Sequence, residues 1–210
     1  MGYEKQVSRA HYDGKAYRSP ERWMSYWHQL ETVRATKARE VLEIGLGEGV
    51  VARELTHRGV SVVTLDIAED LKPDIVGSVT AMPIADRAYD AVLAAEILEH
   101  IRFEDVGTAL AEIARVTRMH AVITLPHPGY VFLATLKLPM LRRLTLFFQL
   151  PFFWKAHRFD GQHYWELGKR TYPLSRFLDE ARRAGLRLVS TKKYSDDPAH
   201  RVFLFERIES

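Results

Sequence analysis

Three glycines at alternate positions follow an apolar run in the segment VLEIGLGEGV: Gly45, Gly47 and Gly49. Glu43 lies two residues ahead of the first glycine. Glycines let the backbone approach a ligand closely and present its amide groups near a helix N-terminus. The spacing differs from the G-x-G-x-x-G fingerprint of dinucleotide sites, because position 50 is Val50. A carboxylate beside the loop suits an ammonium group, so the segment predicts a small-molecule site for a ligand that carries one.

A second acidic residue, Asp66, ends the β-branched, apolar run VSVVTLD, 17 residues after Gly49. A carboxylate at the end of a strand can accept hydrogen bonds from both hydroxyl groups of a ribose. The alternative is that Asp66 is only a helix N-cap. Together with Glu43, it favours a ligand with an amino-acid end, a ribose and no phosphate groups. We therefore predict S-adenosyl-L-methionine as the cofactor and S-adenosyl-L-homocysteine as the product.

Apolar runs of strand length alternate with helical patterns as far as residue 126. The expected strands cover residues 40–45, 60–66, 73–76, 89–96 and 120–126. Consecutive parallel strands require crossover helices, and the crossovers cover both faces of the sheet. The sequence therefore predicts an α/β fold with a Rossmann-like, doubly wound, mostly parallel sheet.

The C-terminal part follows a different pattern. A helical pattern at 171–185 precedes two strand-like runs, LRLVSTKKYSD and HRVFLFERI, which are separated only by a short turn around Asp196–Pro198. So short a link cannot hold a crossover, and the two strands must form an antiparallel hairpin. The hairpin completes a seven-stranded sheet.

A long apolar insertion separates the fifth strand from the last helix. Its segment YVFLATLKLPMLRRLTLFFQLPFFW is interrupted by prolines and basic residues, and the longest uncharged run, 144–154, is too short to span a bilayer. We expect a helical insertion that packs over the open end of the sheet. The alternatives are a homodimer surface or a peripheral membrane contact through residues 130–157.

We expect one domain over residues 1–210. An N-terminal cap with an amphipathic helix at 19–37 is followed by the cofactor-binding core, the apolar and aromatic insertion or lid, and the C-terminal helix and hairpin; these parts cover 1–38, 39–127, 128–170 and 171–210.

Three segments together, VLEIGLGEG, VVTLD and VGSVTAMPIADRAYDAVLAAEILEHI, resemble class I S-adenosylmethionine-dependent methyltransferases of the group called methyltransferase type 11. The resemblance implies that the adenine end of the cofactor lies among Ile67, Ser78, Val79 and Met82. Members of the family usually carry an aspartate near position 78, where it accepts a hydrogen bond from the adenine amino group. This chain has Ser78, whose hydroxyl would accept that hydrogen bond directly or through water.

Glu96 follows the expected fourth strand, where it faces the cofactor or the substrate; the alternative is a helix cap with Glu99 and His100 nearby. In the N-terminal segment, Tyr12, Tyr17 and Arg18 are candidates to cover the methionine end of the cofactor. None of these positions is determined by spacing alone.

Some acceptors of a methyl group need a general base to remove a proton. The candidate catalytic bases are His127, at the end of the fifth strand, and His163, in the polar and aromatic segment HRFDGQHYWELG. The alternatives are that His127 only terminates a strand and that His163 is a packing residue. Although the chain has nine histidines, none is paired with carboxylates at a convincing helical spacing, and we predict no metal site.

The composition limits the remaining possibilities. The absence of cysteine excludes disulfides and thiolate chemistry, and the N-terminus lacks the apolar core of a signal peptide, so we expect a cytoplasmic protein. Acidic residues dominate 41–110 and basic residues dominate 131–193, but no nucleic-acid motif accompanies this asymmetry, and a nucleic-acid partner is not expected. The predicted function is methyl transfer to a small-molecule or lipid-like acceptor; the alternatives are a non-catalytic cofactor-binding module and an RNA methyltransferase.

Overall fold

A computed structural model describes residues 19–137, 139–140 and 143–208, so Tyr12, Tyr17 and Arg18 lie outside the described residues. The elements follow one another in this order: α1 (Pro20–Ala35), β1 (Glu40–Ile44), α2 (Val50–His57), β2 (Ser61–Asp66), the 3-10 helix η3 (Glu69–Leu71), β3 (Ile75–Val76), β4 (Tyr89–Ala95), the 3-10 helix η4 (Leu98–His100), α3 (Phe103–Val116), β5 (Thr117–Pro126), β6 (Gly129–Leu136), β7 (Leu144–Pro151), α4 (Leu174–Arg183), β8 (Leu186–Tyr194) and β9 (Asp197–Arg207).

The main sheet has seven strands in the order β3-β2-β1-β4-β5-β9-β8. The first five run parallel, and β9 is antiparallel to both of its neighbours. This arrangement confirms the predicted mostly parallel sheet with an antiparallel C-terminal hairpin. It also brings the carboxyl ends of β1, β2 and β4 to one edge, which is where ligands bind in such sheets.

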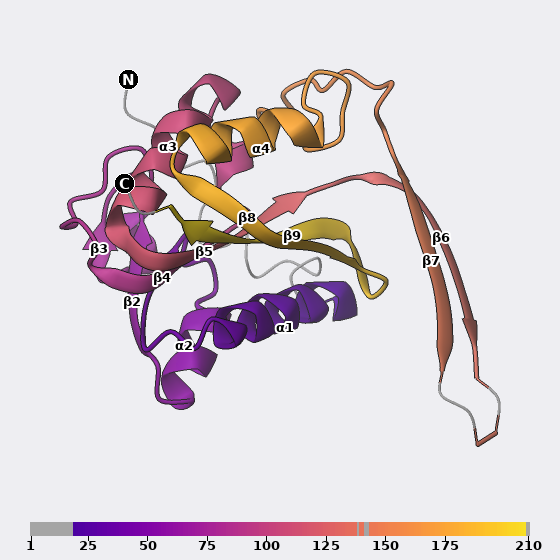
Figure 1. Cartoon of the computed structure of the whole chain (residues 1–210), viewed down its shortest axis with the longest axis horizontal. Helices are drawn as coiled ribbons and strands as arrows, with labels where there is room; N and C mark the ends of the chain where they lie inside the picture. The colour runs from indigo at the N-terminus through magenta and orange to yellow at the C-terminus, as the bar shows by residue number, and fades with distance from the viewer. Residues whose placement is uncertain (1–18, 138, 141–142, 209–210) are drawn as a thin grey trace.

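Helices cover both faces of the sheet, with α1 and α2 on one side and α3 and α4 on the other (Figure 1). Successive side chains of a strand point to opposite faces, so each central strand contributes to both cores. In β1, Val41 packs with Leu30 and Leu55 on one face, whereas Leu42 packs with Leu110 on the other. Apolar packing on both faces thus holds the strand ends in a fixed position.

The predicted helical insertion is wrong, because residues 129–151 form a two-stranded antiparallel hairpin. The ladder of β6 and β7 runs from the pair Gly129↔Pro151 to the pair Leu136↔Leu144. Each strand contains a run of aromatic or β-branched residues, Tyr130–Phe132 in β6 and Phe147–Phe148 in β7, and such residues favour extended backbone over helix. The hairpin projects away from the sheet instead of packing over its open end (Figure 1).

The hairpin exposes apolar side chains on both faces. Consecutive residues of β6, Phe132 and Leu133, are 60% and 51% exposed, and neighbours along a strand point in opposite directions. The helical pattern was predicted from apolarity alone, which does not distinguish a buried helix from an exposed ribbon. None of the helices among the described residues has the length and apolarity that a membrane crossing needs.

The segment after the hairpin returns to the body of the protein and is anchored by Trp165. This indole is fully buried and its Nε1 donates a hydrogen bond to the carbonyl oxygen of Leu98 at 2.9 Å. Its ring packs edge-on against Phe103, at 5.0 Å between centroids. The anchor places the neighbouring residue His163 beside η4.

Candidate functional site

The loop between β1 and α2 depends on its glycines. Gly45 has a φ of +85°, and a Cβ at this position would overlap Cδ1 of Ile97. Gly49 has a φ of +64° and is the N-cap of α2. Positive φ values strain residues other than glycine. The loop therefore requires glycine at both positions, and it lies at the N-terminus of a helix, where backbone amides can bind a ligand.

Asp66 lies at the end of β2, directly beside this loop. Its Oδ2 accepts a hydrogen bond from the amide of Leu46 at 2.8 Å, and its Oδ1 accepts one from the amide of Ala68 at 2.8 Å. Burial raises the pKa of Asp66, whereas these amide hydrogen bonds act in the opposite direction. Each carboxylate oxygen can accept more than one hydrogen bond, so Asp66 can hold the glycine loop and a ligand hydroxyl together.

Glu43 belongs to β1, and its buried side chain points toward the first turn of α2. Burial raises its pKa to about 8, and a hydrogen bond from the amide of Ala52 opposes this effect. Among the described residues, Oε2 of Glu43 has no hydrogen-bond partner. The carboxyl group thus caps the first turn of α2, where no N-cap side chain does so. Its remaining oxygen, Oε2, is buried, and the residue as a whole is 5% exposed.

The residues expected around an adenine ring follow β2 and β3. Ile67 is 36% exposed and offers an apolar surface, whereas Val79 and Met82 belong to the hydrophobic core. The main-chain amide of Met82 donates to Oε2 of Glu112 at 2.7 Å, which fixes the turn to α3. The hydroxyl of Ser78 lies 2.9 Å from that of Thr80. The serine is therefore already engaged in its own turn.

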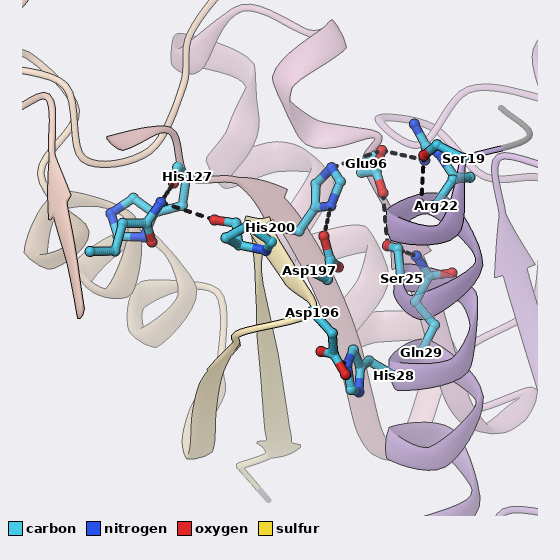
Figure 2. Close-up of polar contacts among 12 residues, drawn as sticks. Ser19, Arg22, Ser25, His28, Gln29, Glu96, His127, Asp196, Asp197 and His200 are labelled. Carbon is cyan, nitrogen blue, oxygen red and sulfur yellow. Dashed lines mark hydrogen bonds and ion pairs between the residues drawn. The ribbon is translucent and has the colours of Figure 1, made fainter. Parts of the chain in front are cut away.

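Glu96, just after β4, lies at the centre of a polar cluster that sequence analysis missed (Figure 2). Its Oε2 is 2.7 Å from Nη1 of Arg22 in α1 and 3.4 Å from Nε2 of His200 in β9. The hydroxyl of Ser25 donates to its Oε1 at 3.4 Å, and Nδ1 of His200 lies 2.7 Å from Oδ1 of Asp197. Glu96 therefore ties α1 to the sheet where the glycine loop lies.

The charges in this cluster stabilise one another. Burial alone would raise the pKa of Glu96, but the charges of His200 and Arg22 hold it well below its usual range. Burial alone would lower the pKa of His200, but Glu96 and Asp197 raise it to about 10. A salt-bridged carboxylate of this kind holds neighbouring elements together and accepts hydrogen bonds, but it is a weak base.

His127 is buried at the base of the hairpin. Burial, with the charges of Lys193 and Arg201, lowers its pKa to about 3. Its ring packs against Gly168, and its carbonyl oxygen accepts a hydrogen bond from Nε2 of Gln149 at 2.8 Å. Figure 2 draws His127 well apart from Glu96. These contacts match the alternative in which His127 terminates a strand.

His163 lies beside η4, in a second cluster of titratable side chains. Its Nδ1 is 3.3 Å from Oε1 of Glu166, and its ring meets that of His100 edge-on at 5.1 Å between centroids. Burial alone would lower the pKa of His163, but the hydrogen bond to Glu166 and the charge of Glu99 raise it. Glu99 is itself buried, which raises its pKa to about 8, and the charge of Glu96 adds to the shift.

The two predicted histidines therefore have different surroundings. His163 lies with carboxylates and with His100, whereas His127 is buried against Gly168 and near two basic residues. The partners that sequence analysis missed, Arg22 and His200, are far from Glu96 along the chain. No local pattern signals such contacts, since they arise only when α1 and β9 pack against the end of β4.

Comparison with known proteins gives a consistent result. A family model described as a methyltransferase domain matches residues 42–125. A demethylmenaquinone methyltransferase of Renibacterium salmoninarum is 32% identical over 104 residues, which cover 44% of this chain and 43% of that protein. An uncharacterized methyltransferase of Mycobacterium tuberculosis is 34% identical over 91 residues, 39% of this chain and 36% of that protein. The chain thus spans less than half the length of these curated relatives.

Solved structures share the fold at low sequence identity. The 1,6-didemethyltoxoflavin-N1-methyltransferase of Burkholderia thailandensis, solved with S-adenosylhomocysteine, aligns with a TM-score of 0.62 and 15% identity over 96% of this chain and 87% of that chain. A Haloferax volcanii complex of the Trm112 methyltransferase activator with a putative methyltransferase aligns with a TM-score of 0.60 and 12% identity. The alignment covers 97% of this chain and 99% of that chain. The family-model match and the curated relatives support the predicted resemblance to methyltransferases over residues 42–125, and the solved structures share the fold.

Proposed function

We propose that this chain, whose residues 42–125 match a methyltransferase-domain family model, is a class I S-adenosylmethionine-dependent methyltransferase that transfers a methyl group to a small-molecule or lipid-like acceptor. The observation that carries the proposal is the contact between Asp66 and the glycine loop. A carboxylate, a bare backbone turn and a helix N-terminus converge there at the carboxyl ends of β1 and β2.

The cofactor supplies the electrophilic methyl group, and the chain supplies binding, orientation and exclusion of water. Asp66 would hold the ribose, and the backbone of Gly45 and Gly47 would face the methionine end. The unpartnered oxygen of Glu43 lies beside that loop and supports a role toward the ammonium group. Ile67, with its exposed side chain, would pack against the adenine ring.

Two kinds of observation support the nature of the acceptor. One relative is named for demethylmenaquinone and one structural neighbour for 1,6-didemethyltoxoflavin, and both names denote small molecules. The apolar hairpin, residues 129–151, supports a lipid-like acceptor or a peripheral contact with a membrane or a second copy. Of the two candidate bases, we favour His163 for contact with the acceptor side, because His127 is packed against Gly168.

Formation of S-adenosylhomocysteine tests this proposal. The full chain would be incubated with S-adenosylmethionine and a panel of quinol, phenol and nitrogen-heterocycle acceptors, and the product quantified by mass spectrometry. We expect product with at least one acceptor and none with Asp66→Ala. Binding of S-adenosylmethionine without product across the panel would instead indicate the non-catalytic module, and transfer to RNA alone would indicate the nucleic-acid alternative.

A further inference from the structure

We propose that Glu99, His100 and His163 form a site for one divalent first-row transition-metal ion, with Zn²⁺ as the reference ion. One potential ligand atom of each residue lies within 4.8 Å of the others. Small side-chain rotations would bring these atoms to the bond lengths of about 2.0–2.2 Å that Zn²⁺ makes with nitrogen and carboxylate ligands. Two imidazoles and one carboxylate also leave coordination positions for a water or a substrate oxygen.

The carboxylate of Glu99 gives the first independent support. Glu99 is only 1% exposed, and among the described residues its Oε2 has no hydrogen-bond partner. A buried polar atom without a partner is costly. The nearby imidazoles by themselves do not satisfy this oxygen, whereas a cation held between the three side chains would.

The orientation of the imidazoles of His100 and His163 gives the second independent support for a metal site. Nδ1 of His100 lies 3.1 Å from the carbonyl oxygen of Gln162. A carbonyl only accepts, so Nδ1 carries the proton, and in the neutral ring Nε2 carries the lone pair that binds metals. Nδ1 of His163 likewise lies 3.3 Å from Oε1 of Glu166. Metal-binding histidines are oriented by such acceptors on their other nitrogen.

A neighbouring group, Asp160 with His163 and Glu166, has a similar spacing but different surroundings. Oδ1 of Asp160 accepts hydrogen bonds from the amides of Gln162 and His163, and its side chain is 52% exposed. Glu166 is paired with Lys169 at 2.6 Å. These carboxylates already have partners, so they orient His163 and are not our first choice as ligands.

The site lies close to the glycine loop. Glu99 and His100 belong to η4, which begins just after Ile97, and the side chain of Ile97 fills the space above Gly45. The prediction of no metal rests on spacing along the chain, where His163 lies 63 positions after His100. The fold brings them together through the anchor at Trp165. Metal binding needs neither cofactor nor acceptor and can therefore be measured separately from methyl transfer.

Titration calorimetry with Zn²⁺ on the chelator-treated full chain, together with the visible absorption of bound Co²⁺, tests the proposal. We expect one ion per chain, and at least a 10-fold loss of affinity in both Glu99→Gln and His163→Ala. His57→Ala and Glu69→Gln, at exposed positions of α2 and η3, are the matched controls and should bind as the unmodified chain does. Thermal melts without metal check that each variant is folded.

Three outcomes would overturn the assignment. These are the absence of saturable Zn²⁺ binding, binding that both variants retain at full affinity, and a larger loss in Asp160→Asn than in Glu99→Gln. Each of these outcomes concerns Zn²⁺ binding, which is measured without cofactor or acceptor. Binding of S-adenosylmethionine and formation of S-adenosylhomocysteine are measured separately on the unmodified chain, so failure of this site is distinguishable from failure of the proposed function.

Discussion

Apolar residues are buried in one region of this chain and exposed in another. The first region is the cofactor edge, which consists of the carboxyl ends of β1 and β2 with the glycine loop, and the second is the projecting hairpin of β6 and β7. At the cofactor edge, Leu42 and Leu65 are fully buried and fix the strand ends that carry Asp66 and the glycines. In the hairpin, Leu146 and Phe148 are 65% and 59% exposed. Hydrophobic stabilisation follows the apolar area removed from water. The cofactor edge is therefore held in place by the folded chain itself, whereas the hairpin side chains contribute little to its stability.

The largest expected difference between these regions is in stability. Trp165→Ala should lower the free energy of unfolding by about 3–5 kcal/mol, because it removes a fully buried indole and leaves a cavity. Leu146→Ala in the hairpin should change it by no more than about 0.5 kcal/mol. Urea unfolding monitored by circular dichroism measures both. Similar losses in the two variants would show that the hairpin is packed in solution.

A smaller effect is expected at the glycine loop. Gly45→Ala should destabilise the protein by about 1–3 kcal/mol, because alanine is strained at positive φ and its Cβ displaces Ile97. Binding of S-adenosylmethionine should weaken as well. Gly59→Ala is the matched control for the backbone strain, since its φ is +83° but no atom lies near the added Cβ. Equal effects of the two substitutions on cofactor binding would contradict the role of residue 45.

The cluster around Glu96 predicts a dependence of stability on pH. The pKa of His200 is about 10 in the folded chain, above the unfolded value of about 6.5. The stability that its charge gives, through Glu96 and Asp197, is thus complete below about pH 6.5 and is lost as the pH rises through 10. Urea unfolding between pH 7 and 10 should show this decline, and His200→Gln should flatten it. His57→Gln, at an exposed position, is the control. If the unfolding free energy of His200→Gln declined with pH as steeply as that of His57→Gln, the assignment would be refuted.

A substitution in the hairpin should have a small effect on stability and a separate effect on function. Phe148→Ser, on the exposed hairpin, should leave the unfolding free energy nearly unchanged, apart from a cross-strand contact with Phe132 worth about 0.2–1 kcal/mol. If the hairpin receives a lipid-like acceptor, the KM for that acceptor should rise while the affinity for S-adenosylmethionine stays constant. Steady-state kinetics with the best acceptor of the panel checks this, and an unchanged KM would exclude Phe148 from the acceptor path.

The sequence predicted the strand ends that carry Asp66 and the glycine loop, because the determinants of these strands are local. β-Branched runs ending in Asp66 or in the glycine loop specify both the strands and the residues at their ends. The hairpin was mispredicted because consecutive apolar residues give neither a helical nor an alternating pattern when both faces are apolar. The Arg22–Glu96–His200 contacts could not be predicted, since they join α1, β4 and β9 across the whole chain.

The central claim is that Asp66 and the glycine loop beside it bind S-adenosylmethionine. Calorimetric titration of the full chain with S-adenosylmethionine, compared with Asp66→Ala, Asp66→Asn and the exposed control Glu69→Ala, tests it most directly. Hydrogen bonds to a charged group contribute about 1.5–3 kcal/mol, so we predict at least a 10-fold loss of affinity in both Asp66 variants and none in the control. Unchanged affinity in folded Asp66→Ala would contradict the account.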